Sequence, residues 1–149
     1  MPNTVPDLDR FTHEDAWRVG VNLVERAHDQ NLPISVSIRL GEQLVFHAAM
    51  PGTSADDDGW VERKSRIVQR FGRASFDVGQ RFAPDGDALA FLAAFGLSPE
   101  RYFPAGGAVP IVVHGTMVGV LAISGLESSE DHDLAVAALN HLSSEGIQR

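Results

Sequence analysis

The chain has 149 residues, of which 44% are hydrophobic and 21% are charged, a composition typical of one soluble globular domain. Its formal net charge of −8 argues against a nucleic-acid partner, and the absence of cysteine excludes disulfides, thiolate metal sites and cysteine nucleophiles. The first residues, MPNTVPDLDRF, lack the basic and apolar pattern of a signal peptide, so we expect a cytoplasmic protein.

The first elements should be a helix followed by a β-hairpin. Thr12 can cap the helix with Asp15 as its partner in a capping box, and Pro33 lies just beyond the expected end. In residues 34–40, ISVSIRL, apolar and polar side chains alternate, which predicts a half-buried strand. A turn at residues 41–42, with glycine in its first position, then leads into a returning strand, QLVFHAAM.

The middle of the chain should be mostly helical. Ser54 can cap a second helix over residues 55–74, and three aspartates in its first turn suit the positive end of the helix dipole. Residues 75–84 are expected to be irregular. The next stretch, DGDALAFLAAFG, predicts a short helix that ends at Gly96 and is followed by a loop.

A second hairpin and a final helix should complete the chain. The segments AVPIVV and MVGVLAISG predict two strands joined by a turn at residues 114–116. Residues 105–126 carry no charge and could span a bilayer by length, but proline and turn residues interrupt them, so two buried strands explain them better. The final helix should run over residues 129–142, with Ser128 as its cap and Asp131 either closing the capping box or complementing the helix dipole.

This order of elements predicts an α+β fold around one central sheet, since hairpins favour antiparallel pairing and helices flank both hairpins. We expect a single domain over residues 1–149 with its core at residues 12–142. The chain has no strand–helix–strand unit with a glycine-rich first turn, which argues against a Rossmann fold.

The most informative single residue is Lys64, which falls on the apolar face of the second helix. The same face carries Trp60, Ile67, Val68 and Phe71, the aromatic residues being expected in the core. A lysine is rarely buried without a partner, because desolvating its ammonium group is costly. Lys64 therefore either extends its charged end to water or meets a buried carboxylate or an anionic ligand.

Four arginines at helical spacing form a basic stripe on the flank of the same helix: Arg63, Arg66, Arg70 and Arg73. Such a stripe can bind the carboxylates of a ligand or of a neighbouring subunit. It can equally be a solvated helix face with some intrachain ion pairs.

The histidines are scattered and none has the paired spacing of a metal site, so we expect no metal centre. The acidic run EDHD at residues 130–133 does not change this expectation, because successive helical residues point about 100° apart and cannot converge on one ion. His132 remains the one side chain of this run that can face a cleft.

Gly106 and Gly107 lie where a loop enters a strand. Without a Cβ, they allow a backbone conformation with positive φ, or a close approach that lets backbone amides bind an anion. Ser124 lacks the pattern of a nucleophile elbow, because Ala122 replaces the first glycine. We assign no catalytic residue and expect a binding role, the enzymatic alternative being that Lys64, Asp131 and His132 act as acid and base.

These stretches resemble a known family. The segment GGAVPIVVHGTMVGVLAISGL followed by EDH, with GWVERKSRIVQRF upstream, is similar to the GlcG/HbpS-like superfamily of haem-degrading-domain-like proteins, and most to its branch of uncharacterised small bacterial and fungal proteins. The similarity covers residues 16–142. It rests on Trp60, Arg63, Lys64, Gly106, Gly107, Pro110, Ile111, Gly119, Ser124, Gly125, Asp131 and His132.

The resemblance implies a profilin-like fold, an antiparallel sheet of about five strands with helices on both faces. It also implies homo-oligomers, usually built from dimers, and one cleft within a subunit or across a dimer interface. The residues it assigns to this cleft are Lys64, Gly106, Gly107, Ser124, Gly125, Asp131 and His132.

We expect the cleft to bind haem or another anionic small molecule, although no histidine is marked by its spacing as an axial ligand. The alternative is an oligomeric interaction or accessory protein without catalytic activity, whose surface binds a protein partner.

Overall fold

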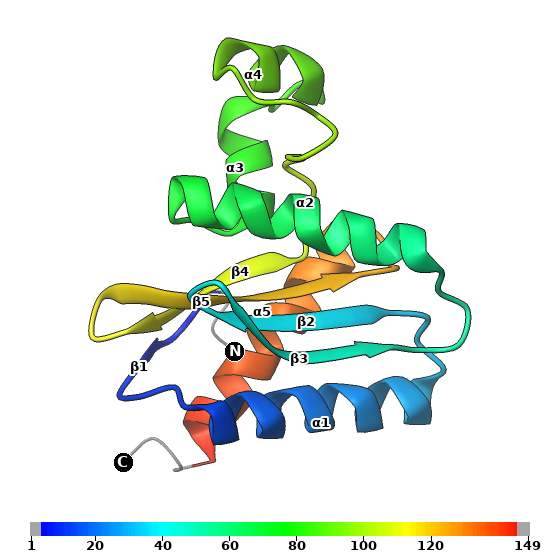
Figure 1. Ribbon diagram of the computed structural model, residues 1–149, viewed down its shortest axis with the longest axis vertical. Coiled ribbons are helices and arrows are strands. Elements are labelled where there is room, and N and C mark those ends of the chain that lie inside the picture. The colour runs from blue at the N-terminus through cyan, green and yellow to red at the C-terminus, as the bar shows by residue number, and fades with distance from the viewer. Residues whose placement is uncertain (1–3, 146–149) are drawn as a thin grey trace.

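The computed structural model describes residues 4–145 as an α+β fold of five strands and five helices (Figure 1). The strands are β1 (Asp7–Leu8), β2 (Ser35–Leu40), β3 (Gln43–Ala49), β4 (Ala108–Val113) and β5 (Thr116–Ser124). The helices are α1 (His13–Gln30), α2 (Ala55–Phe71), α3 (Ser75–Phe82), α4 (Ala88–Ala94) and α5 (Ser128–Ser144).

The strands form one sheet in the order β1-β4-β5-β2-β3. Both predicted hairpins are present, and β2 and β5 pair antiparallel at the centre of the sheet. The sheet is antiparallel, as expected, except at one edge, where β1 pairs with β4 in parallel. A two-residue strand is too short to show a periodic pattern, so β1 could not be predicted from its own residues.

Helices cover both faces of the sheet, as expected. Figure 1 shows α2 on one face and α1 with α5 on the other, while α3 and α4 stand beyond α2. The largest apolar cluster lies between the sheet and the α1/α5 layer, and a smaller one joins α2 to β4 and β5. A third cluster links α2 to α3 and α4, so these two short helices form an arm on the α2 side.

Strand β2 is more deeply buried than its alternating sequence indicated. The apolar residues Val36 and Ile38 face one layer, but Ser35 and Ser37 on the other face are also buried. The prediction of a half-buried strand is wrong because β2 lies between two neighbouring strands and beneath α2. Small hydroxyl side chains let the helix pack closely on this face of the sheet.

The predicted starts of the first two helices are confirmed. Thr12 and Asp15 form the expected capping box at the start of α1, and Ser54 and Asp57 form another at the start of α2. The second helix is shorter than predicted, because Gly72 adopts a left-handed conformation with φ of 67° and ends it at Phe71.

The segment expected to be irregular contains α3. Ser75 begins this helix and its buried hydroxyl lies within hydrogen-bonding distance of the backbone of Ala108 in β4. Four rings from three different segments then pack around the arm: Phe71, Phe82, Phe91 and Phe95. These contacts between distant residues stabilise a helix of eight residues that is too short to be seen in its own sequence.

A candidate ligand-binding cleft at the start of α5

A cleft of about 280 Å³ opens where the start of α5, the end of β5 and the loop before β4 meet α2. Its lining residues are Asp57, Trp60, Lys64, Ala105, Gly106, Ser124, Gly125, Leu126, Ser128 and Asp131. Five of the seven residues assigned to one cleft from the sequence are among them, and they come from α2, β5, α5 and two loops.

Lys64 is buried at the base of the cleft, with only 2% of its surface exposed. Its Nζ atom donates hydrogen bonds to the carbonyl oxygens of Gly106 at 2.9 Å and Ile123 at 2.7 Å. A third bond joins it to the Oδ2 atom of Asp131 at 3.3 Å. An ammonium group has three N–H donors, so these oxygens of the chain use all of them.

The other half of this ion pair, Asp131, is held from two sides. Its Oδ1 atom accepts a hydrogen bond from the backbone N–H of Leu126 at 3.1 Å, while Oδ2 faces Lys64. Burial raises the pKa of Asp131 to about 6 from its ordinary value of 3.8, although Lys64 opposes this shift. Burial likewise lowers the pKa of Lys64 despite the nearby carboxylate. Of the alternatives left open for Lys64, the structure shows the contact with a buried carboxylate.

Two glycines allow this close packing. Gly107 has a φ of 134°, and a Cβ there would meet the carbonyl of Ile123 and lie 2.6 Å from the Nζ atom of Lys64. At Gly106, a Cβ would meet the carbonyl of Ser128. The structure thus shows a positive φ at Gly107 and a close approach to other groups of the chain at both glycines, while anion binding by their amides stays a prediction.

The start of α5 differs from its prediction. Glu127 and Glu130, rather than Ser128 and Asp131, form the capping box. The hydroxyl of Ser128 accepts a hydrogen bond from the backbone N–H of Gly106, which ties the helix to the loop before β4. Asp131 lies one residue beyond the position that closes the capping box. Its carboxylate pairs instead with Lys64, which is 67 positions away in the sequence, so local spacing could not reveal this contact.

Ser124 and Gly125 form the wall of the cleft at the end of β5. Ser124 pairs with Ser35 in the sheet, and its side chain is almost fully buried. Gly125 has a φ of 136°, and a Cβ there would meet the carbonyl of Pro33. This tight turn directs the chain from β5 into α5 across the cleft.

His132 is not among the residues that line the cleft. Its ring stacks on Phe76 of α3 with the ring centroids 4.9 Å apart. The Nδ1 atom is buried and, within residues 4–145, has no hydrogen-bond partner. The two neighbours Asp131 and His132 thus point to different surroundings, as their helical spacing requires.

Trp60 was assigned to the core by its position, and the structure places it in the cleft wall. The guanidinium of Arg63 lies 3.9 Å from the centre of its ring, and Phe103 contacts it edge-on at 5.2 Å. The sequence feature that could have placed Trp60 in the cleft is its position one helical turn before Lys64. Asp57, Ala105 and Leu126 also line the cleft and had no distinguishing pattern in the sequence.

The described residues contain no group of three or more histidines and acids that could hold a metal ion. The cleft itself carries one lysine and two aspartates but no histidine among its lining residues. It therefore offers polar contacts to the edge of a haem group and no axial histidine to its iron.

Comparison with known proteins places this architecture in a family. Residues 11–140 match the family described as haem degrading protein HbpS-like. The chain belongs to this HbpS-like family. It is 43% identical over 148 residues to a UPF0303 protein of Streptomyces avermitilis, covering 93% of this chain and 90% of the relative. A UPF0303 protein of Streptomyces coelicolor is 44% identical over 131 residues, covering 87% of this chain and 82% of the relative.

Solved structures share the fold of this HbpS-like chain. The Ybr137w protein superposes with a TM-score of 0.83 at 29% identity, covering 94% of this chain and 82% of the other. The PduOC:heme complex gives a TM-score of 0.73 at 22% identity, covering 87% and 93%. HbpS itself gives 0.70 at 18% identity, covering 95% and 96%. The predicted family and α+β fold are thus confirmed.

The uncharged run at residues 105–126 forms β4 and β5, as expected. Across residues 4–145, no helix has both the length and the apolar character that a membrane span requires.

Proposed function

We propose that this chain is a small-ligand-binding domain whose cleft at the start of α5 takes an anionic group. The observation that carries the proposal is the convergence of a helix start, a glycine-rich loop and a buried ion pair on one hollow. The first-turn amides of a helix lack intrahelical partners and favour anions. Trp60 adds an aromatic wall against which a flat ligand can pack.

In this proposal Lys64 positions the cleft instead of contacting the ligand. All three of its donors already end on oxygens of the chain, and the charge of its ammonium is balanced by Asp131. Asp57 also lines the cleft, where its carboxylate accepts the backbone N–H of Ser54. The attraction for an anion therefore comes from the helix dipole and from the first-turn amides of Ser128 and Ser129, which the capping box does not use, each contribution amounting to about 0.3–1 kcal/mol.

Haem is the first ligand to test, because the PduOC structure is a haem complex and the family is described as haem degrading. A volume of about 280 Å³ lies at the lower end of the range for small-molecule sites. The cleft therefore fits a propionate edge or a smaller anion, with most of a haem ring outside. Binding without an axial histidine should give only a small change in the Soret band.

The test uses Trp60 as a reporter. The chain has two tryptophans, and Trp17 lies exposed on α1, so the Trp17→Phe variant leaves Trp60 as the single tryptophan. Haemin and smaller carboxylates are titrated while Trp60 fluorescence is recorded. In this background, Ala105→Glu and Ala105→Gln place side chains of equal size in the cleft, and only the first adds a negative charge.

We expect saturable quenching of Trp60, with Ala105→Glu binding several-fold more weakly than Ala105→Gln. Equal or tighter binding by Ala105→Glu would show that the cleft does not select anions and would overturn the proposal. If haemin gives no saturable quenching but a smaller carboxylate does, haem is excluded as the ligand and the proposal of an anion-binding cleft stands.

A second candidate function is assembly through the α3–α4 arm. Five large apolar side chains are strongly exposed within residues 4–145, and three of them, Phe82, Leu89 and Phe95, lie on this arm. A hollow of about 400 Å³ beside Phe82 is also lined by Asp85 and Asp87. An exposed apolar patch of this kind is typical of a protein interface, and we propose a second copy of the chain as its occupant.

Light scattering coupled to size-exclusion chromatography tests the assembly. We expect an oligomer that Leu89→Glu dissociates, whereas Leu44→Glu, at another exposed leucine on β3, leaves the mass unchanged. A monomeric wild-type chain, or an oligomer that tolerates Leu89→Glu, would contradict this candidate.

A further inference from the structure

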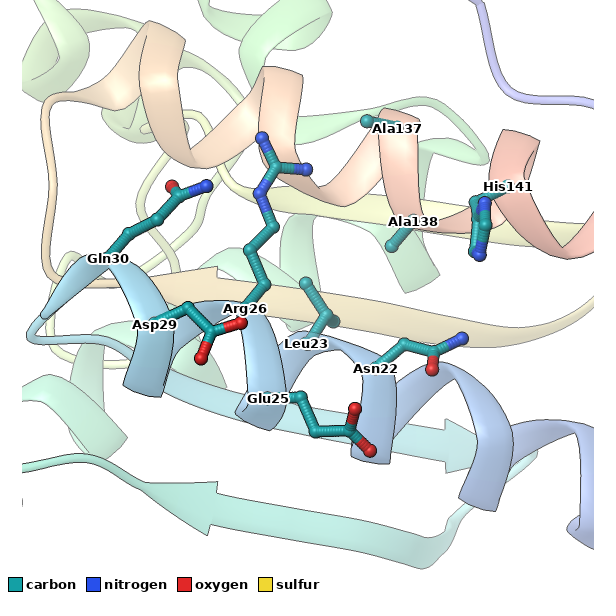
Figure 2. Close-up of a pocket in the computed structure, with 9 residues that line it drawn as sticks. All are labelled: Asn22, Leu23, Glu25, Arg26, Asp29, Gln30, Ala137, Ala138 and His141. Carbon is teal, nitrogen blue, oxygen red and sulfur yellow. The ribbon is translucent and has the colours of Figure 1, made fainter.

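A second hollow lies on the opposite side of the sheet from the cleft, between α1 and α5 (Figure 2). Its volume is about 360 Å³, and it shares no lining residue with the cleft. The residues that line it are Asn22, Leu23, Glu25, Arg26, Asp29, Gln30, Ala137, Ala138 and His141.

The hollow exists because the two helices present side chains of unequal length to each other. The two helices pack together on the sheet, where Leu23 and Leu139 belong to the same buried cluster. Above this layer, α5 contributes Ala137 and Ala138, whose side chains end at Cβ and leave the space open. Leu23, which is only 3% exposed, and the two alanines give the hollow an apolar floor.

Polar side chains line the α1 side of this floor at regular spacing. Asn22, Arg26 and Gln30 are four residues apart and so lie on one face of the helix. Figure 2 shows the side chains of Arg26 and Gln30 extending from α1 toward α5, whereas the carboxylate of Glu25 points away from α5. Within residues 4–145, the guanidinium of Arg26 takes part in no hydrogen bond or ion pair.

We infer that this hollow binds a small aromatic monocarboxylate. The planar body packs on Leu23 and Ala138, and the carboxylate meets the two-pronged guanidinium of Arg26. Asn22 and His141 lie toward the end of the hollow away from Gln30, where they can bind a polar group at the far end of the ligand.

The acidic residues of the rim narrow the ligand class. Glu25 and Asp29 add two negative charges beside the single guanidinium of Arg26, while His141 faces Glu145 at 3.5 Å. Arg26 can pair directly with one ligand carboxylate, whereas a second anionic group would meet Glu25 and Asp29. The hollow therefore favours a monocarboxylate over a dicarboxylate or a phosphate ester.

The experiment is calorimetric titration of the full chain with 4-hydroxycinnamate, which has a carboxylate at one end and a hydroxyl at the other. The methyl ester removes the charge, and cinnamate removes the hydroxyl. We expect saturable binding, a loss of about 10-fold or more for the ester, and a smaller loss for cinnamate.

Three variants locate the binding. Arg26→Gln should weaken it about 10-fold or more, and Arg18→Gln, which makes the same charge change on α1 outside the hollow, should leave it unchanged. Ala138→Leu should abolish binding by filling the space, without a change in charge. Retained affinity in Arg26→Gln, or no binding by the wild-type chain, would overturn the inference.

The cleft variant Ala105→Glu separates this inference from the proposed function. It should bind 4-hydroxycinnamate as the wild-type chain does. A loss in Ala105→Glu equal to that in Arg26→Gln would place the carboxylate in the cleft and refute a second site.

Discussion

The two hollows on opposite faces of the sheet each contain one cation, and the two cations are held in opposite ways. In the cleft, Lys64 is 2% exposed and donates to three oxygens of the chain. Between α1 and α5, Arg26 is exposed and has no partner within residues 4–145. A buried charge must be compensated before any ligand arrives, whereas an exposed guanidinium beside an apolar floor remains free to bind one.

Replacing each cation by methionine should give the largest contrast between the two regions. Lys64→Met leaves the carboxylate of Asp131 and two carbonyls buried without their donor, so we expect a loss of about 3–5 kcal/mol in the free energy of unfolding. Arg26→Met should change it by about 0.5 kcal/mol or less. Urea denaturation of both variants measures these values, and equal losses would contradict the contrast.

The pH dependence of stability should report the burial of the ion pair. Because the pKa of Asp131 is raised to about 6, the folded chain binds this proton more tightly than the unfolded chain. The resulting stability is fully present below pH 3.8 and is lost as the pH rises through about 6, with an upper bound of about 3 kcal/mol.

Asp131→Asn is the matched control for this pH dependence. The difference in unfolding free energy between wild type and variant, measured from pH 4 to pH 7, should shift in favour of the variant as the pH rises. A constant difference across this range would show that Asp131 keeps its ordinary pKa.

Gly107→Ala should sharpen the contrast between the buried Lys64 and the exposed Arg26, because it disturbs only the close packing around Lys64. The added Cβ meets the carbonyl of Ile123 at a φ of 134°, so we expect a loss of about 1–3 kcal/mol. Gly72→Ala is the control, since its φ is also positive but no atom lies within 4 Å of the added Cβ. Thermal unfolding should show a greater loss for Gly107→Ala, and the reverse order would refute the role of close packing.

His132→Phe should have the smallest effect. It retains the stack on Phe76 and removes a buried Nδ1 atom that has no partner within residues 4–145, so stability should change by about 1 kcal/mol or less. The variant should also quench with haemin as wild type does. A lost haemin response would show that His132 reaches the cleft.

Local patterns predicted those parts of the fold that local forces determine. The caps at Thr12 and Ser54 and the two hairpins follow from short-range periodicity and turn chemistry, whereas the helices on both faces were implied by the family resemblance. The short strand β1 and the helix α3 did not, because both depend on contacts with distant segments.

The same distinction applies to the cleft. A lysine on an apolar helix face indicated a buried partner, but the identity of that partner as Asp131 depends on a contact between α2 and α5. Asp131 instead suggested a helix cap by its spacing. The family resemblance grouped these residues in one cleft, and it included His132, whose ring packs on α3.

The most direct test of whether Lys64 is a structural part of the cleft is its charge and the protection of its ammonium protons from exchange with water. Lys64 is the single lysine of the chain, so a sample labelled with ¹⁵N-lysine gives one side-chain ammonium signal. We predict a slowly exchanging NH₃⁺ resonance at neutral pH that is nearly unchanged by haemin, while the backbone amides at the start of α5 shift. A rapidly exchanging Nζ resonance, or one that moves on addition of ligand more than those amides do, would contradict the assignment of Lys64 to the structure of the cleft.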